Sequence, residues 1–415
     1  MREMKDSGLQ WAGNIPYDWN TTKGKYFMAI LERPIKDDDG VITCFRNGEV
    51  TLRANRREDG FTIATVEAGY QGIEPGDLVI HGMDGFAGAI GISDSRGKGT
   101  PALNVLSCSE NKKYIMYLLR AMAYTEVFMA LSTGIRVRTC DTNWKKLRSL
   151  DYLIPPEEEQ QRIADFLDDK YAEIDTLTAD IQTQIDTLEQ YKRSVITETV
   201  TKGLNPDAEM KDSGIQWIGR MPVHWDVIRG KYILRYMQKP VREDDGVITC
   251  FRDGEVTLRS NRREDGFTMS DKEIGYQGID VGDLVVHGMD GFAGSIGISD
   301  SRGKASPVLN VLDTDQCKRY IMYYLRSMAY SDVFLALATG IRVRSCDLRW
   351  NKLAELSYPV PPLDEQNAIV KHIDSVLSKA DAVIADKKAQ LATLDEYKKS
   401  LIFEYVTGKK EVPTS

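Results

Sequence analysis

The stretch IPPEEEQQRI, residues 154–163, returns as VPPLDEQNAI at residues 360–369. Each copy joins two prolines to a Glu-Gln pair and then opens a polar segment with regularly spaced apolar residues. Proline cannot continue a preceding element but fits the first turn of a helix, so each copy predicts a boundary followed by a new helix. Two such boundaries organise the whole chain.

Every repeated segment of the chain returns after the same 206 residues. The pairs include CFRNGEVTLRANRREDGF from Cys44 with CFRDGEVTLRSNRREDGF from Cys250, HGMDGFAG at 81 and 287, GISDSRGK at 91 and 297, and TGIRVR at 133 and 339. The halves align without a gap, which indicates duplicated domains rather than a solenoid. Polar positions are kept as well as apolar ones, so both halves are expected to contact the same kind of surface.

A heptad pattern follows each double proline. The first helix carries Leu167, Ile174, Ile181, Leu188 and Val195, and we predict that Leu177, Ile185 and Tyr191 fill the alternate positions. The second helix carries Ile373, Leu377, Ile384, Leu391, Leu394 and Leu401. These patterns predict helices of about 40 residues, roughly 60 Å long, paired as an antiparallel coiled coil. Two separate amphipathic helices, each packed on its own domain, are the alternative.

The segments before each double proline indicate a mixed α+β domain. GVITCF, EVTLRA and DLVIHG predict short strands between turns, and residues 112–134 predict one helix ending at Gly134. The sequence therefore predicts two tandem mixed α/β domains alternating with two long helices, with a pseudo-two-fold internal repeat. The predicted bounds are 1–153 and 208–359 for the domains, and 154–207 and 360–415 for the helices.

Composition narrows the class of protein. The chain has 415 residues, with 42% hydrophobic and 28% charged residues, and lacks an apolar run of membrane-spanning length. Six cysteines without a C-x-x-C pair fit a reducing, cytoplasmic setting. Net charge is −8, but residues 157–190 hold eleven acidic residues against Arg162 and Lys170. The rest of the chain is close to neutral, so the net charge does not exclude nucleic acid.

The sequence matches none of the catalytic motifs considered below. GFAGAIGISDSRGKG lacks the spacing of a phosphate-binding loop and predicts a strand-turn-strand with tight glycine bends. Nucleophile-elbow, zinc-protease and amino-methyltransferase signatures are missing. An enzyme with duplicated His81/Asp84 and His287/Asp290 sites stays open as an alternative.

Arginine and asparagine mark the candidate DNA contacts. Arginine forks suit guanine and phosphate, and asparagine suits adenine, although acidic neighbours could instead neutralise these arginines on a solvated face. The candidates in the first half are Arg46, Asn47, Arg53, Asn55, Arg56, Arg57, Arg96, Lys98, Arg136 and Arg138. Those in the second half are Arg252, Asp253, Arg259, Asn261, Arg262, Arg263, Arg302, Lys304, Arg342 and Arg344.

The layout resembles the specificity subunit of type I restriction–modification systems. MKDSGIQWIGRMPVHW followed by a domain, then a Pro-Pro-x-x-Glu-Gln helix start, all occurring twice, carries the resemblance over essentially the whole chain. The resemblance implies a non-catalytic subunit whose two domains each read one part of a split DNA target. It also implies helices that set the spacing between the two parts and dock methyltransferase subunits.

Partners and cofactors follow from the same resemblance. Double-stranded DNA, two adenine-methyltransferase subunits carrying S-adenosylmethionine, and restriction or translocase subunits are expected, with no cofactor on this chain and no membrane. The expected coiled-coil and docking residues are Leu167, Ile174, Ile181, Leu188, Ile373, Ile384, Leu391 and Leu394. Near-identical domains predict a near-palindromic target, with Asn47 against Asp253 as a source of asymmetry or as drift on an exposed turn. A DNA-independent scaffold with two sensor domains is the alternative function.

Overall fold

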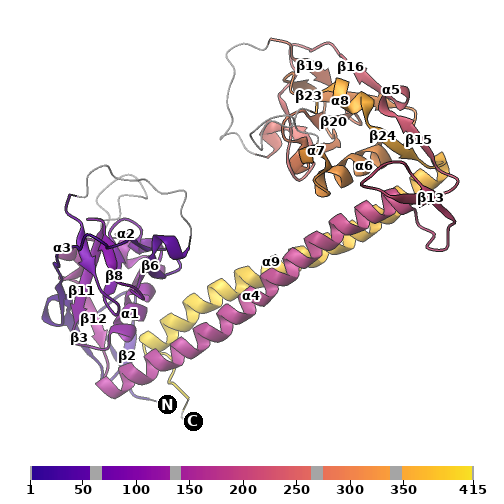
Figure 1. Cartoon of the computed structure of the whole chain (residues 1–415). Helices are drawn as coiled ribbons and strands as arrows, with labels where there is room; N and C mark the ends of the chain where they lie inside the picture. The colour runs from indigo at the N-terminus through magenta and orange to yellow at the C-terminus, as the bar shows by residue number, and fades with distance from the viewer. Residues whose placement is uncertain (1, 57–67, 131–141, 263–273, 337–347, 414–415) are drawn as a thin grey trace. The chain divides into compact units, whose positions relative to one another are not determined.

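The computed structural model describes residues 2–56, 68–130, 142–262, 274–336 and 348–413. The chain divides into two compact units. The first comprises residues 1–181 and 388–415, and the second comprises residues 182–387. Each unit holds one mixed α+β domain and a segment of each long helix, α4 (Glu157–Lys202) and α9 (Leu363–Val406) (Figure 1). The fold class predicted from the repeat is confirmed.

Antiparallel strands build the domain of the first unit. Its four-stranded sheet has the order β4-β11-β8-β9, where β4 is Met28–Ile30, β11 is Leu103–Cys108, β8 is Leu78–His81 and β9 is Ile90–Ile92. Four two-stranded pairs surround it: β1 (Met4–Asp6) with β2 (Asn14–Pro16), β3 (Asn20–Lys23) with β12 (Asp151–Ile154), β5 (Ile42–Cys44) with β6 (Val50–Leu52), and β7 (Gln71–Ile73) with β10 (Gly97–Gly99).

The second unit repeats this topology. Its sheet has the order β16-β23-β20-β21, where β16 is Leu234–Met237, β23 is Leu309–Thr314, β20 is Leu284–His287 and β21 is Ile296–Ile298. The pairs are β13 (Met210–Asp212) with β14 (Arg220–Pro222), β15 (Asp226–Arg229) with β24 (Ser357–Val360), β17 (Ile248–Cys250) with β18 (Val256–Leu258), and β19 (Gln277–Ile279) with β22 (Gly303–Ala305). The predicted strands GVITCF, EVTLRA and DLVIHG are confirmed as β5, β6 and β8.

Both faces of the first sheet are buried. Leu78 and Ile80 of β8 pack in the core under α1 (Lys112–Tyr124), while Val79 packs with the β5–β6 hairpin on the other face. This explains why DLVIH reads as a continuous apolar run instead of an alternating one.

The predicted single helix over residues 112–134 is wrong. It breaks after α1, and α2 (Val127–Ala130) follows; in the second unit α6 (Lys318–Tyr330) and α7 (Val333–Ala336) break in the same way. Glu126 and Asp332 at the breaks have positive φ angles of 61° and 55°. A positive φ is uncommon for residues other than glycine, and the apolar periodicity continues through the break without marking it. The predicted end at Gly134 lies outside the described residues.

The remaining short helices flank the sheets. They are α3 (Trp144–Leu147), α5 (Gly230–Ile233) and α8 (Trp350–Glu355), with the 3-10 turns η1 (Gly24–Tyr26), η2 (Arg53–Asn55), η3 (Gly85–Ala87), η5 (Arg259–Asn261) and η6 (Gly291–Ala293).

The Pro-Pro-x-x-Glu-Gln motif fastens each long helix to its domain. Gln160 is buried; its amide donates to the Pro155 carbonyl (2.9 Å) and its oxygen accepts from the Asn111 amide at the start of α1 (3.1 Å). Gln366 makes the equivalent bonds to Pro361 (2.8 Å) and Cys317 (2.9 Å). The motif that carries the family resemblance therefore has a structural role at the helix start.

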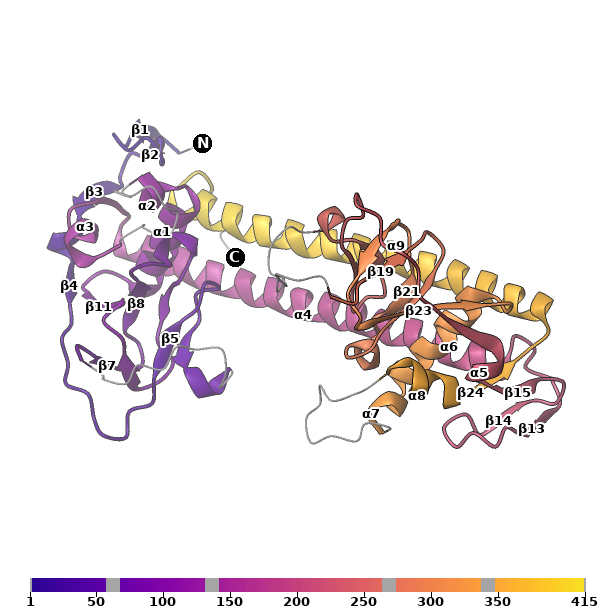
Figure 2. The ribbon, with the colours of Figure 1, turned by 90° about the horizontal axis from the view of Figure 1, so that it is seen from above.

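The two long helices run antiparallel within each unit (Figure 1 and Figure 2). In the first unit Phe166 packs on Tyr405, with ring centroids 4.5 Å apart, and the Tyr171 hydroxyl donates to the Lys398 carbonyl. In the second unit Lys192 pairs with Asp381 (2.6 Å). Partner numbers fall along α9 as they rise along α4, which is the signature of antiparallel pairing.

The alternate heptad positions were partly misassigned. Leu167, Ile174, Ile181 and Ile185 are buried and Leu188 is half-buried, but Leu177 and Tyr191 are 47% and 51% exposed. The second row lies four residues after the first and holds Tyr171, Thr178, Ile185 and Lys192, of which Ile185 is buried and the others are half-buried. Since Tyr171 and Lys192 contact α9 through a ring and a charge, hydrophobicity alone does not identify them. On α9 the seam residues Ile373 and Ile384 are buried, and Leu391 and Leu394 are half-buried.

Candidate nucleic-acid interface

The residues between β5 and β6, together with η2, form a small arginine-bearing surface that we call the arginine turn, residues 45–56. The Arg56 guanidinium lies over the Phe45 ring at 4.2 Å and donates to the Asn47 side-chain oxygen (3.2 Å). Arg53 donates to the Thr43 hydroxyl and Asn55 to the Thr51 hydroxyl. Sequence reasoning predicted these residues as neighbours, and the structure brings them together.

The second arginine turn, residues 251–262, has the same geometry. Arg262 lies over Phe251 at 4.3 Å and is held by Asp253, which replaces Asn47. Both side chains at this position also accept the backbone amide two residues later, at 3.3 Å in the first turn and 3.1 Å in the second. The geometry thus supports the interpretation of this difference as drift within a conserved turn.

A second loop adjoins each arginine turn. We call residues 81–88 and 287–294 the histidine loops. Arg46 donates to Asp84 (2.8 Å), and Arg252 donates to Asp290 (3.1 Å). The two arginine side chains remain 60% and 61% exposed. Each unit therefore presents one exposed arginine, held in place by a carboxylate, at the junction of turn and loop.

The histidines in these loops stabilise the loop backbone. His81 Nδ1 accepts the backbone amides of Met83 (3.3 Å) and Asp84 (3.1 Å). Burial lowers the pKa of His81, and the same cause lowers the pKa of His287. An imidazole that accepts two amides at one nitrogen keeps its proton on the other, which favours a neutral loop anchor over a general base.

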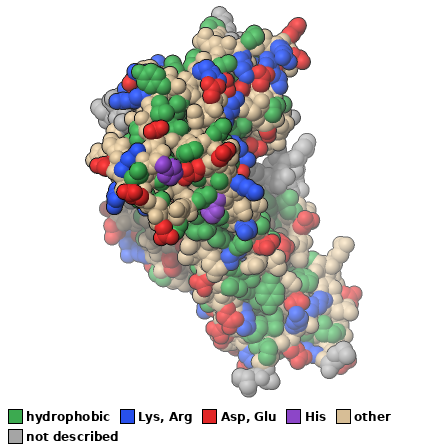
Figure 3. All heavy atoms as spheres, turned by 90° about the vertical axis from the view of Figure 1, so that its right-hand side faces the viewer, with side chains coloured by type: hydrophobic (Ala, Val, Ile, Leu, Met, Phe, Trp, Pro, Cys, Tyr) green, Lys and Arg blue, Asp and Glu red, His purple; other side chains and the backbone are tan. Residues whose placement is uncertain are grey.

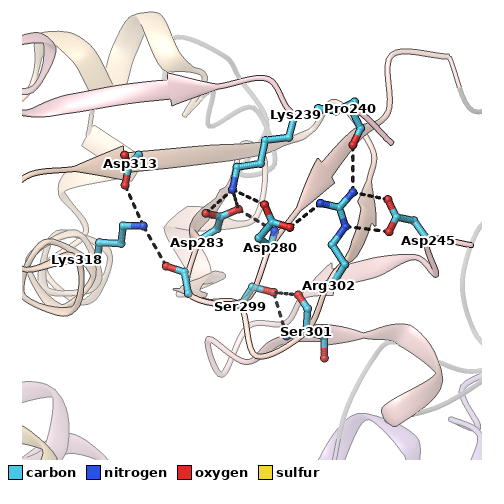
Figure 4. Close-up of polar contacts among 11 residues, drawn as sticks. Lys239, Pro240, Asp245, Asp280, Asp283, Ser299, Ser301, Arg302, Asp313 and Lys318 are labelled. Carbon is cyan, nitrogen blue, oxygen red and sulfur yellow. Dashed lines mark hydrogen bonds and ion pairs between the residues drawn. The ribbon is translucent and has the colours of Figure 1, made fainter. Parts of the chain in front are cut away.

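Arg96 and Arg302 are bound inside ion-pair clusters. Arg302 donates to Asp245 (2.9 and 2.8 Å), to Asp280 (2.5 Å) and to the Pro240 carbonyl (3.1 Å), as Figure 4 shows. Arg96 meets Asp39 and Glu74 in the same way. Both guanidinium groups are mostly buried and surrounded by carboxylates. The geometry favours a structural role, so we leave them out of the proposed DNA interface.

The other candidates divide into two groups. Lys98 and Lys304 lie half-buried on the edge strands β10 and β22, where each has a polar partner. Arg57, Arg136, Arg138, Arg263, Arg342 and Arg344 lie outside the described residues.

Sequence reasoning missed an arginine behind each arginine turn, buried in the first unit and half-buried in the second. Arg120 on α1 is 7% exposed and donates to the backbone carbonyls of Ile90 (2.9 Å) and Gly48 (3.0 Å). Arg326 on α6 donates in the same way to Ile296 (2.7 Å) and Asp253 (3.4 Å). A cation that binds the carbonyl at the tip of the turn fixes the turn to the sheet. In the sequence, the only sign of this role is that each arginine lies on an otherwise apolar face of its helix.

The tip of the first arginine turn packs against Gly91 with no room for a side chain. A methyl group at Gly91 would lie 1.9 Å from the Gly48 carbonyl oxygen. We expect Gly91→Ala to displace the turn and lower the unfolding free energy of the first domain by about 2–4 kcal/mol, measured by denaturant unfolding.

Gly76→Ala is the matched control for this prediction. Gly76 has a φ of +86° with open space around its Cα, so the substitution adds backbone strain of about 1–2 kcal/mol without a steric clash. Equal losses in the two variants would contradict the tight packing at Gly91.

The described residues contain neither a candidate metal site nor a candidate membrane span. No group of three or more His, Cys, Asp or Glu side chains in the described ranges could hold a metal ion. Among the same residues, no helix combines the length and the apolar character needed to cross a bilayer. Figure 3 shows basic side chains beside acidic ones on the face it displays, in keeping with the paired arginines above.

Comparison with known proteins bears directly on the resemblance. No family model matches the chain. A protein of Methanocaldococcus jannaschii, provisionally named type I restriction enzyme MjaX specificity subunit, is 25% identical over 97% of this chain and 96% of its own length. The type I restriction enzyme MjaVIII specificity subunit of the same organism is 24% identical over 73% of this chain and 72% of its own.

A solved structure shares the fold. A chain from a study of complex assembly and conformational transition of the type I R-M system superposes with a TM-score of 0.66 at 13% identity, covering 95% of this chain and 99% of that one. Along nearly its whole length, then, this chain is similar in sequence to a protein named as a type I restriction enzyme specificity subunit, and it shares the fold of a chain from a type I R-M system.

Proposed function

We propose that this chain is the non-catalytic DNA-specificity subunit of a type I restriction–modification complex. The observation that carries the proposal is the duplicated arginine turn, placed beside a histidine loop in each unit and exposing Arg46 or Arg252. Each surface has the chemistry to contact a DNA groove, where exposed arginines read guanine edges or bind phosphate. The full-length similarity to specificity subunits supports the same assignment.

The helices are proposed to dock adenine-methyltransferase subunits. The predicted residues Leu167, Ile174 and Ile181 are buried within the chain, so they build the helix pair and are not themselves available to a partner. Beyond Leu363 at the start of α9, the large apolar residues that the two long helices expose are Leu177 and Tyr191 on α4, and Val383 and Tyr397 on α9, each 44–51% exposed. These four form two pairs related by the repeat, as expected for two copies of one partner.

The chain is expected to be catalytically silent alone. S-adenosylmethionine would bind the methyltransferase subunits, the described residues offer no metal cluster, and His81 serves as an anchor of its loop. Purified chain, S-adenosylmethionine and DNA should give no methyl transfer, measured with a tritiated methyl donor, until modification subunits are added. Methylation by the chain alone would refute the assignment.

The scaffold alternative makes the opposite prediction. A DNA-independent scaffold with two sensor domains should assemble with partners without changing which sequences they modify. Exchanging this chain for another specificity subunit, with the methyltransferase kept constant, should change the methylated motif if the proposal holds and leave it unchanged if the chain is a scaffold.

A further inference from the structure

A second basic surface lies in the first unit, away from the arginine turn. It comprises Lys23, Lys25 and Tyr26 at the end of β3 and in η1, together with Lys145 and Arg148 in and after α3; we call it the basic surface. The Lys25 amide donates to the Arg148 carbonyl (2.9 Å), which brings the two chain segments side by side. All five side chains are exposed.

The basic surface carries an unbalanced positive charge. Lys23 pairs with Asp151 at 3.1 Å, with both side chains largely exposed. Within the part of the chain that the structure describes, no carboxylate lies within ion-pair distance of Lys25, Lys145 or Arg148. The Lys25 ammonium lies 4.8 Å over the ring of Tyr26, which is itself 72% exposed. Exposed lysines beside an exposed aromatic ring are a composition typical of nucleic-acid surfaces.

The second unit has the same fold here but a different charge. Glu355 stands where the first half has Ser149, and it contacts both Arg229 (3.7 Å) and Lys231 (3.2 Å). Lys145 and Arg148 are replaced by Asn351 and Ala354. The repeat therefore supplies a folded, naturally less basic version of the same surface.

The basic surface is connected to the histidine loop. Thr142, two residues before α3, donates from its backbone amide (2.9 Å) and its hydroxyl (3.0 Å) to the Gly82 carbonyl. Hydrogen bonds thus join the loop that holds Arg46 to Thr142, and the chain continues from Thr142 into Lys145 and Arg148. A duplex that contacts the arginine turn and histidine loop would extend toward these cations.

We propose that the basic surface binds the phosphate backbone of duplex DNA and that the first unit contributes more phosphate contacts than the second. Lysines act as point charges for phosphate without reading bases, so this surface adds affinity and register, not sequence choice. The inference rests on the proposed function, because it assumes that the arginine turns face DNA. It makes the two nearly identical halves unequal in electrostatic affinity.

The test introduces the residues of the second repeat into the first. In the full-length chain, Lys145→Asn, Arg148→Ala and Ser149→Glu recreate the local sequence that already folds in the second unit. Binding to a 40-base-pair mixed-sequence duplex is measured by fluorescence anisotropy across a salt series, with and without modification subunits. We expect the slope of log affinity against log salt to shrink by about 2, since each phosphate contact contributes about 0.9.

Two further variants control for net charge and for folding. Lys388→Asn makes the single Lys145→Asn change at an exposed position on α9 and should leave the slope unchanged. Glu355→Ser frees Arg229 and Lys231 in the second unit and should steepen the slope. If the wild-type chain binds DNA but the triple variant keeps its slope, the basic surface is refuted and the proposed function stands. If the wild-type chain and its complex bind no duplex at all, both are overturned.

Discussion

Genome-wide mapping of methylated adenines should return a split motif whose two halves are inverted repeats or nearly so. The arginine turns differ only by Asn47 against Asp253 and Ala54 against Ser260, and both histidine loops are identical over eight residues. Domains with the same exposed side chains in the same local geometry are expected to read the same bases. Antiparallel helices favour opposite reading directions, as in symmetric dimers on palindromes.

The difference between Asn47 and Asp253 is the change in the arginine turns most able to give the two domains different base preferences, and the structure argues against that. Asn47 and Asp253 use the same oxygen to hold the same arginine and the same turn amide, so the difference is absorbed inside the turn. Replacing Asp253 by Asn should therefore leave the methylated motif unchanged, as single-molecule sequencing of methylated DNA would show. Two unrelated half-sites in the wild-type motif would refute the symmetry argument while leaving the similarity to specificity subunits intact.

The elements that sequence reasoning located share one physical feature. Strands β5, β6 and β8 are apolar runs between turn residues, and each long helix begins at a double proline, so local chemistry alone marks them. Because the sequence repeats after 206 residues, each of these strand and helix patterns occurs twice. Agreement between the two copies made the overall architecture predictable.

The candidate site was less predictable because charge pairing depends on tertiary contacts. Arg96 is separated from its partner Asp39 by 57 residues, and nothing in the local sequence distinguishes it from the exposed Arg46. Arg120 was missed for the opposite reason: a cation on a buried helix face is unusual, and its partners are backbone carbonyls that the sequence does not identify. Residue type indicated which groups could contact DNA, while burial decided which ones are available.

The helix seam contains residues that local sequence marks and residues that only tertiary contacts reveal. The first heptad row is apolar and was found, but the second row holds Tyr171 and Lys192, which were not. Lys398 lies 4.6 Å over the Tyr171 ring, and Lys192 pairs with Asp381 at 2.6 Å. Polar seam residues of this kind specify helix register in coiled coils, at some cost in stability. They also explain why Leu177 and Tyr191, apolar but exposed, were misplaced in the seam.

Aspartate at a seam position of α4 should unfold the helix pair, whereas aspartate one turn away should leave it intact. Ile181 is 5% exposed, and Ile181→Asp would bury a charge with no partner, costing roughly 3 kcal/mol or more. Circular dichroism should show lost helix and a lower melting temperature, and co-purification with methyltransferase subunits should fail. Leu188→Asp added to the same chain should deepen the loss.

Leu177→Asp separates docking from folding. Leu177 is 47% exposed on the same helix, so the carboxylate stays in water and the melting temperature should change little. If the exposed apolar residues form the docking face, this variant keeps its helix content but loses methyltransferase subunits in gel filtration, and Tyr397→Asp behaves alike. Full assembly by both exposed variants would show that partners bind elsewhere, and normal helix content in Ile181→Asp would contradict the paired seam itself.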